Sequence, residues 1–340
     1  MNVTDRRTLA EGRVCVTAFG LGCAALAGLY DAVSEADAIA TLDAAWAAGL
    51  RYFDTAPFYG YTRGERRVGA GLAGRPRGDF AVSTKVGRLM TRDDTVAPGS
   101  DGWADPLPYR PRFDYSYDGV MRSLEQSLGR LGLGRVDILL VHDIGQVTHG
   151  DLHGLHWAQL TRGGGFRALE ELRRDGRVSA IGLGVNEWEV VRDAMQEARL
   201  DCTLLAGRHT LLEQGALRFL DDCARAGNAI IVGGPFNSGV LAGDPKFNYG
   251  AAPPQILRRA QALMDVCAEF GVPLQAAALQ FPTAHPAVVS CVAGVRSVAQ
   301  LKQTVRWFEQ DIPRPLWDAL RRRGLVDAEA PCPGDAGARA

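Results

Sequence analysis

Apolar and polar residues follow one another along this chain in a repeated pattern. Apolar runs of seven to ten residues are each followed by a longer segment with apolar residues at every third or fourth position. The first kind of segment is typical of a buried strand, and the second is typical of an amphipathic helix. The strand-like runs cover residues 14–22, 50–56, 80–87, 136–144, 178–186, 202–211, 229–237 and 288–295.

Eight strand-then-helix pairs are the number in a closed (β/α)8 TIM barrel. We therefore predict an α/β protein with one such barrel over residues 1–325, although a doubly wound sheet has the same periodicity. Residues 312–324 predict an added helix, and the Ala-, Gly- and Pro-rich residues 326–340 predict a disordered tail. The helices are predicted to end at glycines, among them Gly49, Gly176, Gly227 and Gly271.

Three connections are longer than a barrel requires: residues 87–113, 144–165 and 239–253. Loops of this length are typical of lids and binding loops, or are tolerated surface insertions. All three follow strands, so we expect them at the same rim of the barrel. GLGCAA at 20–25 imitates a dinucleotide-binding fingerprint, but no clear strand ending in an acidic residue follows it at the required distance. We interpret it as a turn at that rim.

Composition and charge exclude several classes of function. The formal net charge of the 340 residues is −1, which gives no electrostatic reason to bind nucleic acid or an anionic membrane. No apolar run approaches the roughly 20 residues that span a bilayer, and the polar N-terminus lacks the apolar centre of a signal peptide. Seven scattered cysteines without a CxxC pair predict reduced thiols in a cytoplasmic protein. The oligomeric state stays open.

Ionisable residues close three consecutive strand-like runs: Asp54, Lys85 and His142, with Tyr59 five residues after Asp54. The carboxyl ends of parallel strands share one rim, where α/β barrels build active sites. The ammonium of Lys85 is expected to lower the pKa of Tyr59, and Asp54 to hold the lysine. His142 could orient a substrate oxygen or relay the proton. The group predicts a proton-transfer centre, with a structural Asp–Lys pair as the alternative.

A second group of residues, in the last third of the chain, is suited to phosphate. GGPFNSGVLAG at 233–243 places Asn237 and Ser238 at a glycine-rich turn. AGVRSVAQLKQT at 293–304 places Arg296 at the opening of a helix, where free N–H groups favour an anion. Phosphate sites after the seventh and eighth strands recur in this kind of barrel, although an ordinary solvated helix start remains possible.

In order along the chain, FDTAPFYG, STKVG, LLVHD, GLGVNEWE and the two phosphate-type segments resemble the aldo-keto reductase superfamily. VHDIGQVTHG, GLGVNEWEV and LLAGRHTLLEQ are most similar to its bacterial D-threo-aldose 1-dehydrogenase (L-fucose dehydrogenase) group, with pyridoxal 4-dehydrogenase and L-galactose dehydrogenase as near relatives. The resemblance implies a (β/α)8 barrel without a Rossmann domain that binds extended NAD or NADP across its rim.

The resemblance also implies roles for single residues. Tyr59 would be the general acid/base, Lys85 with Asp54 would depress its pKa, and His142 would orient the reacting oxygen. Asn186 would hold the nicotinamide carboxamide. Together with Asn186, the implied cofactor contacts are His209, Pro235, Phe236, Asn237, Ser238, Gly239, Leu241, Gly294, Arg296, Ser297, Gln300 and Thr304.

Departures from the family pattern leave the choice between NAD and NADP open. Val185 stands where many members have Ser, Ala206 and His209 stand where a Gln and a ring-stacking Tyr are common, and Thr304 replaces an Asn. Trp103 and Trp157 are candidate substrate-stacking surfaces beside Tyr59 and His142, or hydrophobic plugs.

The expected reaction is oxidation of an aldose at C1 to a lactone, with hydride transfer to the nicotinamide. The alternatives are oxidation of an aromatic hemiacetal such as pyridoxal, reduction of small aldehydes, and a regulatory barrel that senses NADP(H). HGDLHGLH at 149–156 is a candidate transition-metal cluster, but nothing in it fixes a geometry and we assign no metal site.

Overall fold

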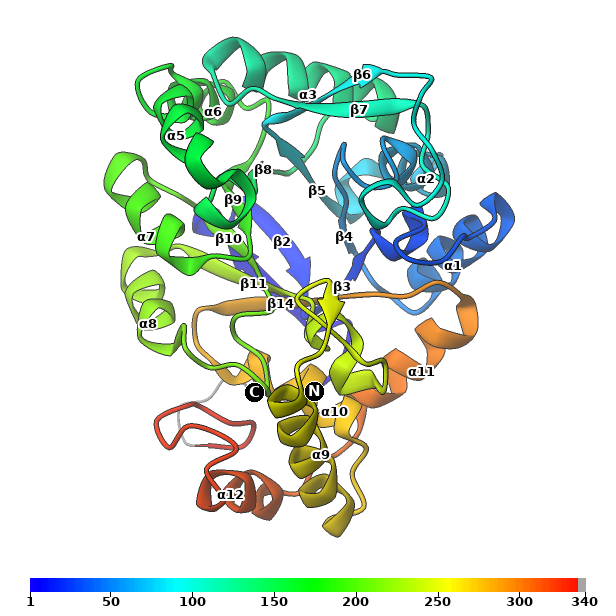
Figure 1. Ribbon diagram of the computed structural model, residues 1–340, viewed down its shortest axis with the longest axis vertical. Helices are drawn as coiled ribbons and strands as arrows, with labels where there is room; N and C mark the ends of the chain where they lie inside the picture. Colours follow the sequence, from blue (N-terminus) through cyan, green and yellow to red (C-terminus); the bar gives the residue numbers. More distant parts are fainter. Residues whose placement is uncertain (336–340) are drawn as a thin grey trace.

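Eight parallel strands close into a barrel in the computed structural model, which describes residues 1–335 (Figure 1). Around the barrel they follow the order β10-β11-β14-β3-β4-β5-β8-β9. This arrangement confirms the predicted (β/α)8 fold. The strands are β3 (Phe19–Gly22), β4 (Tyr52–Asp54), β5 (Ala81–Val86), β8 (Ile138–His142), β9 (Ala180–Val185), β10 (Cys202–Ala206), β11 (Ala229–Gly233) and β14 (Val288–Gly294).

Helices surround the barrel because each has one apolar face to bury against the strands. In α3, for example, the buried side chains recur at Val120, Leu124, Ser127 and Leu131, and the Oγ atom of Ser116 caps the first turn. The helices of the outer ring are α1 (Glu35–Ala47), α2 (Arg63–Leu72), α3 (Tyr117–Leu131), α6 (Gly165–Arg174), α7 (Trp188–Glu197), α8 (Leu217–Ala226), α9 (Pro254–Glu269), α10 (Leu274–Gln280) and α11 (Val298–Glu309). Gly49, Gly176, Gly227 and Gly271 have the left-handed φ predicted for helix ends.

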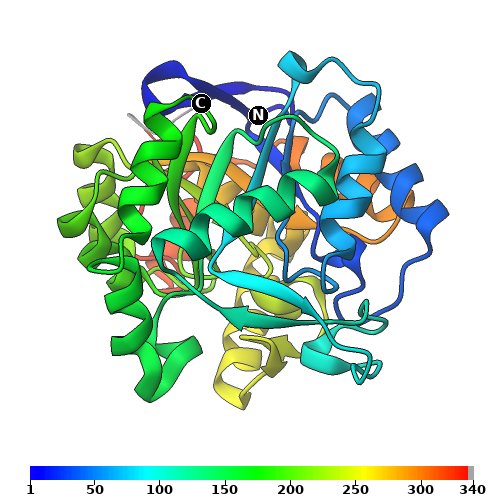
Figure 2. The same ribbon diagram turned by 90° about the horizontal axis from the view of Figure 1, so that it is seen from above.

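A hairpin covers the end of the barrel where the strands begin (Figure 2). It consists of β1 (Arg6–Leu9) and β2 (Val14–Thr17), paired antiparallel. The sequence predicted one strand over 14–22, whereas the chain forms β2 in this hairpin and β3 in the barrel. Leu9, Val14 and Val16 pack on Tyr52 and Ile138 in the interior of the barrel. With this end plugged, the opposite rim is left for a site.

The three long connections contain secondary structure of their own. Residues 87–113 form an antiparallel ribbon of β6 (Arg88–Arg92) and β7 (Tyr109–Phe113). Residues 144–165 hold α4 (Gln146–His149) and α5 (His153–Leu160). The third connection, residues 239–253, begins within the 3-10 segment η6 (Asn237–Ala242) and contains a short hairpin of β12 (Lys246–Phe247) and β13 (Gly250–Ala251).

The end of the chain is more ordered than its composition predicted. The added helix is present as α12 (Arg314–Arg322). Val326, Ala330 and Cys332 are buried in the cluster that contains Trp317, and the guanidinium of Arg321 pairs with the carboxylate of Asp335. The prediction of a disordered tail is therefore wrong for residues 326–335, and residues 336–340 lie outside the described part of the chain.

The described residues contain no single helix that is long and apolar enough to cross a membrane. By length and composition alone, one pair of helices passes that test together, Pro254–Glu269 with Leu274–Ala284, but the pair is bent by 101°.

Candidate active site

The structure brings Asp54, Tyr59, Lys85 and His142 together at the rim where the strands end, and we call these four residues the tetrad. Asp54 closes β4, His142 closes β8, and Lys85 is the second-last residue of β5, which lies between them. Tyr59 lies on the turn after β4, where its N–H donates to Ala56. Parallel pairing in register therefore assembles the predicted group from three neighbouring strands.

Lys85 is the centre of this group. Its ammonium donates to both carboxylate oxygens of Asp54 at 3.0 and 2.9 Å, to the carbonyl oxygen of Thr55 at 2.9 Å and to the phenol oxygen of Tyr59 at 2.9 Å. Ser83 donates a further hydrogen bond of 2.7 Å to Asp54. The lysine is 1% exposed and the aspartate 3%. A buried ion pair of this kind is stable only when its lone pairs and protons are satisfied, as they are here.

The pKa of Tyr59 differs from the sequence-based expectation. Burial, and then the carboxylate of Asp54, raise this pKa well above its ordinary value near 10. We expected Lys85 to lower it. The lysine does contact the phenol, but its charge is already paired with Asp54, and a phenolate here would lose water and face that carboxylate. Tyr59 therefore holds its proton at neutral pH.

His142 is a neutral imidazole at this site. Burial, followed by the charges of Arg88 and Lys85, lowers its pKa well below 6.5. Its ring centroid lies 6.0 Å from that of Tyr59. Nδ1 is buried without a hydrogen-bond partner among the described residues, and Nε2 lies 3.5 Å from Oδ2 of Asp143. A neutral imidazole can donate to, or accept from, an oxygen atom.

Of the two predicted stacking residues, only Trp103 lies beside the tetrad. Its ring centroid is 5.9 Å from that of Tyr59 and 5.6 Å from that of Phe58. Trp157 instead lies on α5, with His153 and Phe166 as its ring neighbours. Within residues 1–335, Trp157 has no ring contact with Tyr59, which its expected role would require. The reason is that α5 packs on α6 along the flank of the barrel (Figure 1).

Asn186 and Ser238 contact Tyr249 at the tip of the β12–β13 hairpin, whereas Nδ2 of Asn237 donates to the carbonyl oxygen of Gly207. Nδ2 of Asn186 donates to the phenol oxygen of Tyr249 at 3.3 Å, and the N–H of Tyr249 donates to Oγ of Ser238 at 3.0 Å. Residues 237–239 have three successive positive φ values of 47°, 62° and 117°. The carboxamide oxygen Oδ1 of Asn237 is buried with no partner among the described residues. Sequence reasoning missed Tyr249 because nothing in a short loop marks a tyrosine as part of a site.

The remaining predicted cofactor residues gather at the start of α11. Oγ of Ser297 caps this helix by accepting from the N–H of Gln300 at 3.2 Å, and Oε1 of Gln300 accepts from the N–H of Arg296 at 2.8 Å. Arg296 pairs with Asp31 at 3.3 Å, while its Nε is buried without a partner within the described chain. Thr304 is buried and donates to the carbonyl of Gln300.

Several other predicted contacts are packed into the fold. His209 is fully buried against Phe281 and His285, and burial lowers its pKa to about 3. It offers no face for stacking on a nicotinamide, so that expectation is wrong for this structure. Leu241 is also fully buried. Pro235, Phe236 and Gly239 lie on the loop after β11, the first buried and the other two half-buried, and Gly294 is the last residue of β14.

The histidine-rich segment at 149–156 forms an aromatic cluster. Nε2 of His149 lies 2.9 Å from the phenol oxygen of Tyr115, and its ring centroid is 4.3 Å from that of His156. Burial, and then His156, lower the pKa of His149 to about 4. Within residues 1–335, no group of three or more His, Cys, Asp or Glu side chains could hold a metal ion.

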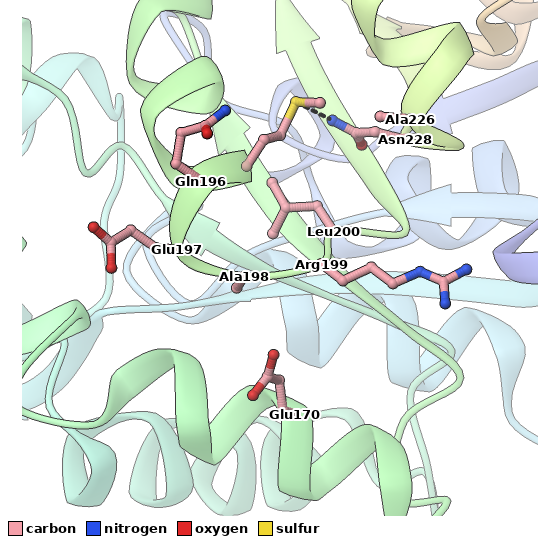
Figure 3. A pocket seen from close by; sticks show the side chains of 9 residues that line it. Glu170, Gln196, Glu197, Ala198, Arg199, Leu200, Ala226 and Asn228 are labelled. Atoms are coloured by element: carbon pink, nitrogen blue, oxygen red, sulfur yellow. Dashed lines mark hydrogen bonds between the residues drawn. The ribbon is translucent and has the colours of Figure 1, made fainter.

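Figure 3 shows a groove of about 390 Å³ to which none of the four tetrad residues contributes. It is lined by Glu170 from the middle of α6, by the end of α7, and by residues that precede β10 and β11, among them Arg199 and Asn228. These positions belong to the end of the barrel where strands begin. We therefore assign the groove no part in the chemistry of the rim.

Comparison with known proteins agrees with this geometry. Residues 18–322 match the model of the Aldo/keto reductase family, and the chain belongs to that family of nicotinamide-dependent oxidoreductases. It is 51% identical to a pyridoxal 4-dehydrogenase from Microbacterium luteolum and 38% identical to a D-threo-aldose 1-dehydrogenase from a Pseudomonas species. Each alignment covers 96% of this chain and 99% of the relative.

Solved structures show the same fold at lower sequence identity. An aldo-keto reductase from Bacillus halodurans in its holo form superposes with a TM-score of 0.72 at 22% identity, covering 96% of this chain and 97% of the other. A glycerol dehydrogenase from Gluconobacter oxydans gives 0.70 at 19% identity, covering 95% and 97%. At such identities the likeness concerns the fold alone.

Proposed function

We propose that this protein oxidises the hydroxyl-bearing carbon of a cyclic hemiacetal to a lactone, with a nicotinamide dinucleotide as electron acceptor. The observation that carries the proposal is the ammonium of Lys85, which joins the carboxylate of Asp54 to the phenol of Tyr59 at hydrogen-bond distance. Such a group moves a proton at an oxygen atom and contains no activated nucleophile.

In this reaction the hemiacetal carbon loses a hydride and its hydroxyl loses a proton, which leaves the lactone carbonyl. A bound nicotinamide supplies the acceptor for the hydride. Tyr59 takes the hydroxyl proton, and the neutral His142 holds the same oxygen. Because the pKa of Tyr59 is raised, its deprotonated, basic form is scarce at neutral pH and becomes more abundant only as pH increases. Oxidation should therefore accelerate toward alkaline pH, and the reverse reduction should be favoured at lower pH.

Two substrate classes share this chemistry, because pyridoxal and the aldoses both exist as cyclic hemiacetals. The sequence motifs pointed to an aldose, and a relative with 38% identity is a D-threo-aldose 1-dehydrogenase. The relative with 51% identity is a pyridoxal 4-dehydrogenase, which supports an aromatic hemiacetal. The ring of Phe58 also favours an aromatic substrate, because it is partly exposed and can pack against a substrate ring; Phe58 in turn rests on Trp103, which is 2% exposed and lies beside Tyr59. We therefore propose the pyridoxal type first and the aldose type second.

For the cofactor we propose NAD rather than NADP. The positive-φ turn at residues 237–239 suits a diphosphate, and the unpartnered carboxamide oxygen of Asn237 could accept a hydrogen bond from a ribose hydroxyl. At the adenosine end, Arg296 is already paired with Asp31, whose side chain is 70% exposed. A 2′-phosphate brought to Arg296 would meet that carboxylate, whereas a 2′-hydroxyl could donate to it.

The test is a substrate panel with product analysis. Reduced cofactor is followed by absorbance with pyridoxal and L-fucose, each with NAD and with NADP, and the product is identified as lactone by mass spectrometry. Lactone from pyridoxal with NAD is the expected result, and turnover of L-fucose alone would favour the aldose type. Absence of lactone from both would contradict the proposal. Binding of NADH and NADPH, measured by calorimetry, tests the cofactor separately, and Asp31→Ala should improve NADPH binding about tenfold.

A further inference from the structure

We propose that the ion pair of Arg88 and Asp143 is a positioning pair for His142, which holds the imidazole in place beside Tyr59. The inference rests on the proposed function insofar as His142 contacts the reacting oxygen. Neither Arg88 nor Asp143 belongs to the tetrad, but Asp143 follows His142 in the chain and Arg88 pairs with Asp143.

Arg88 is fixed on several sides. Its Nη2 lies 2.6 Å from Oδ2 of Asp143, and the side chain is 7% exposed. The guanidinium carbon lies 4.2 Å from the ring centroid of Phe58 and 5.4 Å from that of Phe113. Phe58 in turn lies 6.2 Å from the ring of His142 and precedes Tyr59 in the chain. A planar guanidinium held between rings loses little freedom when it binds a carboxylate.

Asp143 turns back toward the histidine that precedes it. Its φ is +44°, a left-handed conformation that is costly for a residue other than glycine. Its N–H donates to the carbonyl of Gly184 at 3.0 Å, which fixes this conformation against β9. As a result, Oδ2 of Asp143 is 3.5 Å from Nε2 of His142 while it also contacts Arg88. One carboxylate oxygen therefore accepts from the arginine and lies against the edge of the imidazole.

The charges around His142 explain why a pair that positions it needs both a cation, Arg88, and an anion, Asp143. Lys85 on β5 and Arg88 on β6 both oppose protonation of the imidazole, and Asp143 is the nearest carboxylate. Asp54, on β4, is engaged by Lys85, and the phenol of Tyr249 faces the site from the β12–β13 hairpin. Asp143 alone would favour imidazolium. With Arg88 bound to it, the carboxylate can orient the ring without charging it.

Arg88 also acts on Tyr59. Its positive charge lowers the pKa of this tyrosine, against burial and Asp54. Removing Arg88 should therefore have two effects that a merely structural ion pair would not have. The titration of His142 should move to higher pH, and the pH dependence of turnover should shift to higher pH as well.

The experiment compares Arg88→Met and Asp143→Asn with a control at the other end of the barrel. Arg77→Met breaks an ion pair of the same length, 2.6 Å, between Arg77 and Asp137 just before β8. For each full-length variant, kcat, KM and their pH profiles are measured, together with the Kd of NADH. Nitrogen NMR of labelled histidines gives the titration of His142 without any substrate.

We expect Arg88→Met and Asp143→Asn to lower kcat about 10–100-fold, since a misplaced group near the reacting atoms costs up to that much. The Kd of NADH should change less than about threefold. In Arg88→Met the titration of His142 should rise by at least about half a pH unit. Arg77→Met should lower the free energy of unfolding but leave kcat and the titration of His142 unchanged. Arg88→Lys, which keeps the charge, should retain the pH profile with a reduced kcat, and it replaces Arg88→Met if that variant does not fold.

Unchanged kcat in both site variants, or an unchanged His142 titration in Arg88→Met, would overturn the proposal. The NMR measurement also separates the two hypotheses. If the wild type oxidises neither pyridoxal nor L-fucose, the proposed substrates fail, but the titration of His142 in the variants still decides whether the pair acts on it.

Discussion

Lys85→Met should destabilise the protein strongly, although methionine is apolar and similar in length. The substitution removes four contacts of 2.9 to 3.0 Å made by the ammonium. It also leaves the carboxylate of Asp54, which is 3% exposed, with Ser83 as its remaining side-chain donor among the described residues. Breaking a buried ion pair by removing one partner costs about 3–5 kcal/mol, because the other charge stays buried and unpaired.

The double variant Lys85→Met/Asp54→Asn tests whether that charge is the cause. It removes both charges, so we expect a loss at least about 2 kcal/mol smaller than the sum of the two single losses. Urea unfolding followed by tryptophan fluorescence gives the free energies of unfolding. Lys302→Met, at an exposed position of α11, serves as the control and should stay within about 0.5 kcal/mol of wild type. A loss below about 1 kcal/mol for Lys85→Met, or strict additivity, would refute the reasoning.

Three further predictions concern the fold. The pKa of His209 is lowered to about 3, so its neutral form contributes stability that is present above pH 6.5 and lost as pH falls; His209→Phe should remove about 2 kcal/mol of the loss between pH 8 and pH 5, measured by urea unfolding. Gly182→Ala would place a Cβ 1.6 Å from the carbonyl oxygen of Cys202, and we expect a loss above about 3 kcal/mol. In contrast, Gly129→Ala, with nothing within 4 Å, should stabilise α3 by up to about 1 kcal/mol. Deletion of residues 326–340 should lower Tm by several degrees in calorimetry, because it exposes the buried cluster around Trp317; an unchanged Tm would show that this packing is unimportant.

The barrel and the tetrad were readable from the sequence for a physical reason. Strands buried on both faces are continuous apolar runs, so a charged residue at the end of such a run stands out. Asp54 and His142 each end one, Lys85 lies one residue before the end of another, and a closed parallel barrel brings neighbouring strand ends together. The pattern could not separate β2 from β3, because both are apolar and Ala18 alone lies between them.

What the sequence could not give depends on contacts between distant segments. His209 stands where a stacking ring is expected, but the packing of Phe281 and His285 around it decides that it is buried. Trp157 is aromatic and lies on a long loop, yet the direction of α5 takes it to Phe166. The pKa of Tyr59 likewise depends on how many neighbours exclude water, a quantity that spacing along the chain does not contain.

The most direct test of the account is the turnover of Tyr59→Phe on the substrate that the wild type oxidises best. Its matched control is Tyr117→Phe, which removes a phenol that donates to Glu171 at 2.6 Å on the outside of the barrel. If Tyr59 carries the proton, Tyr59→Phe should lower kcat about 10²–10⁴-fold, while the Kd of the cofactor stays near that of wild type and Tyr117→Phe remains fully active. A kcat within about threefold of wild type in Tyr59→Phe would contradict the assignment of Tyr59 as the proton-transfer residue.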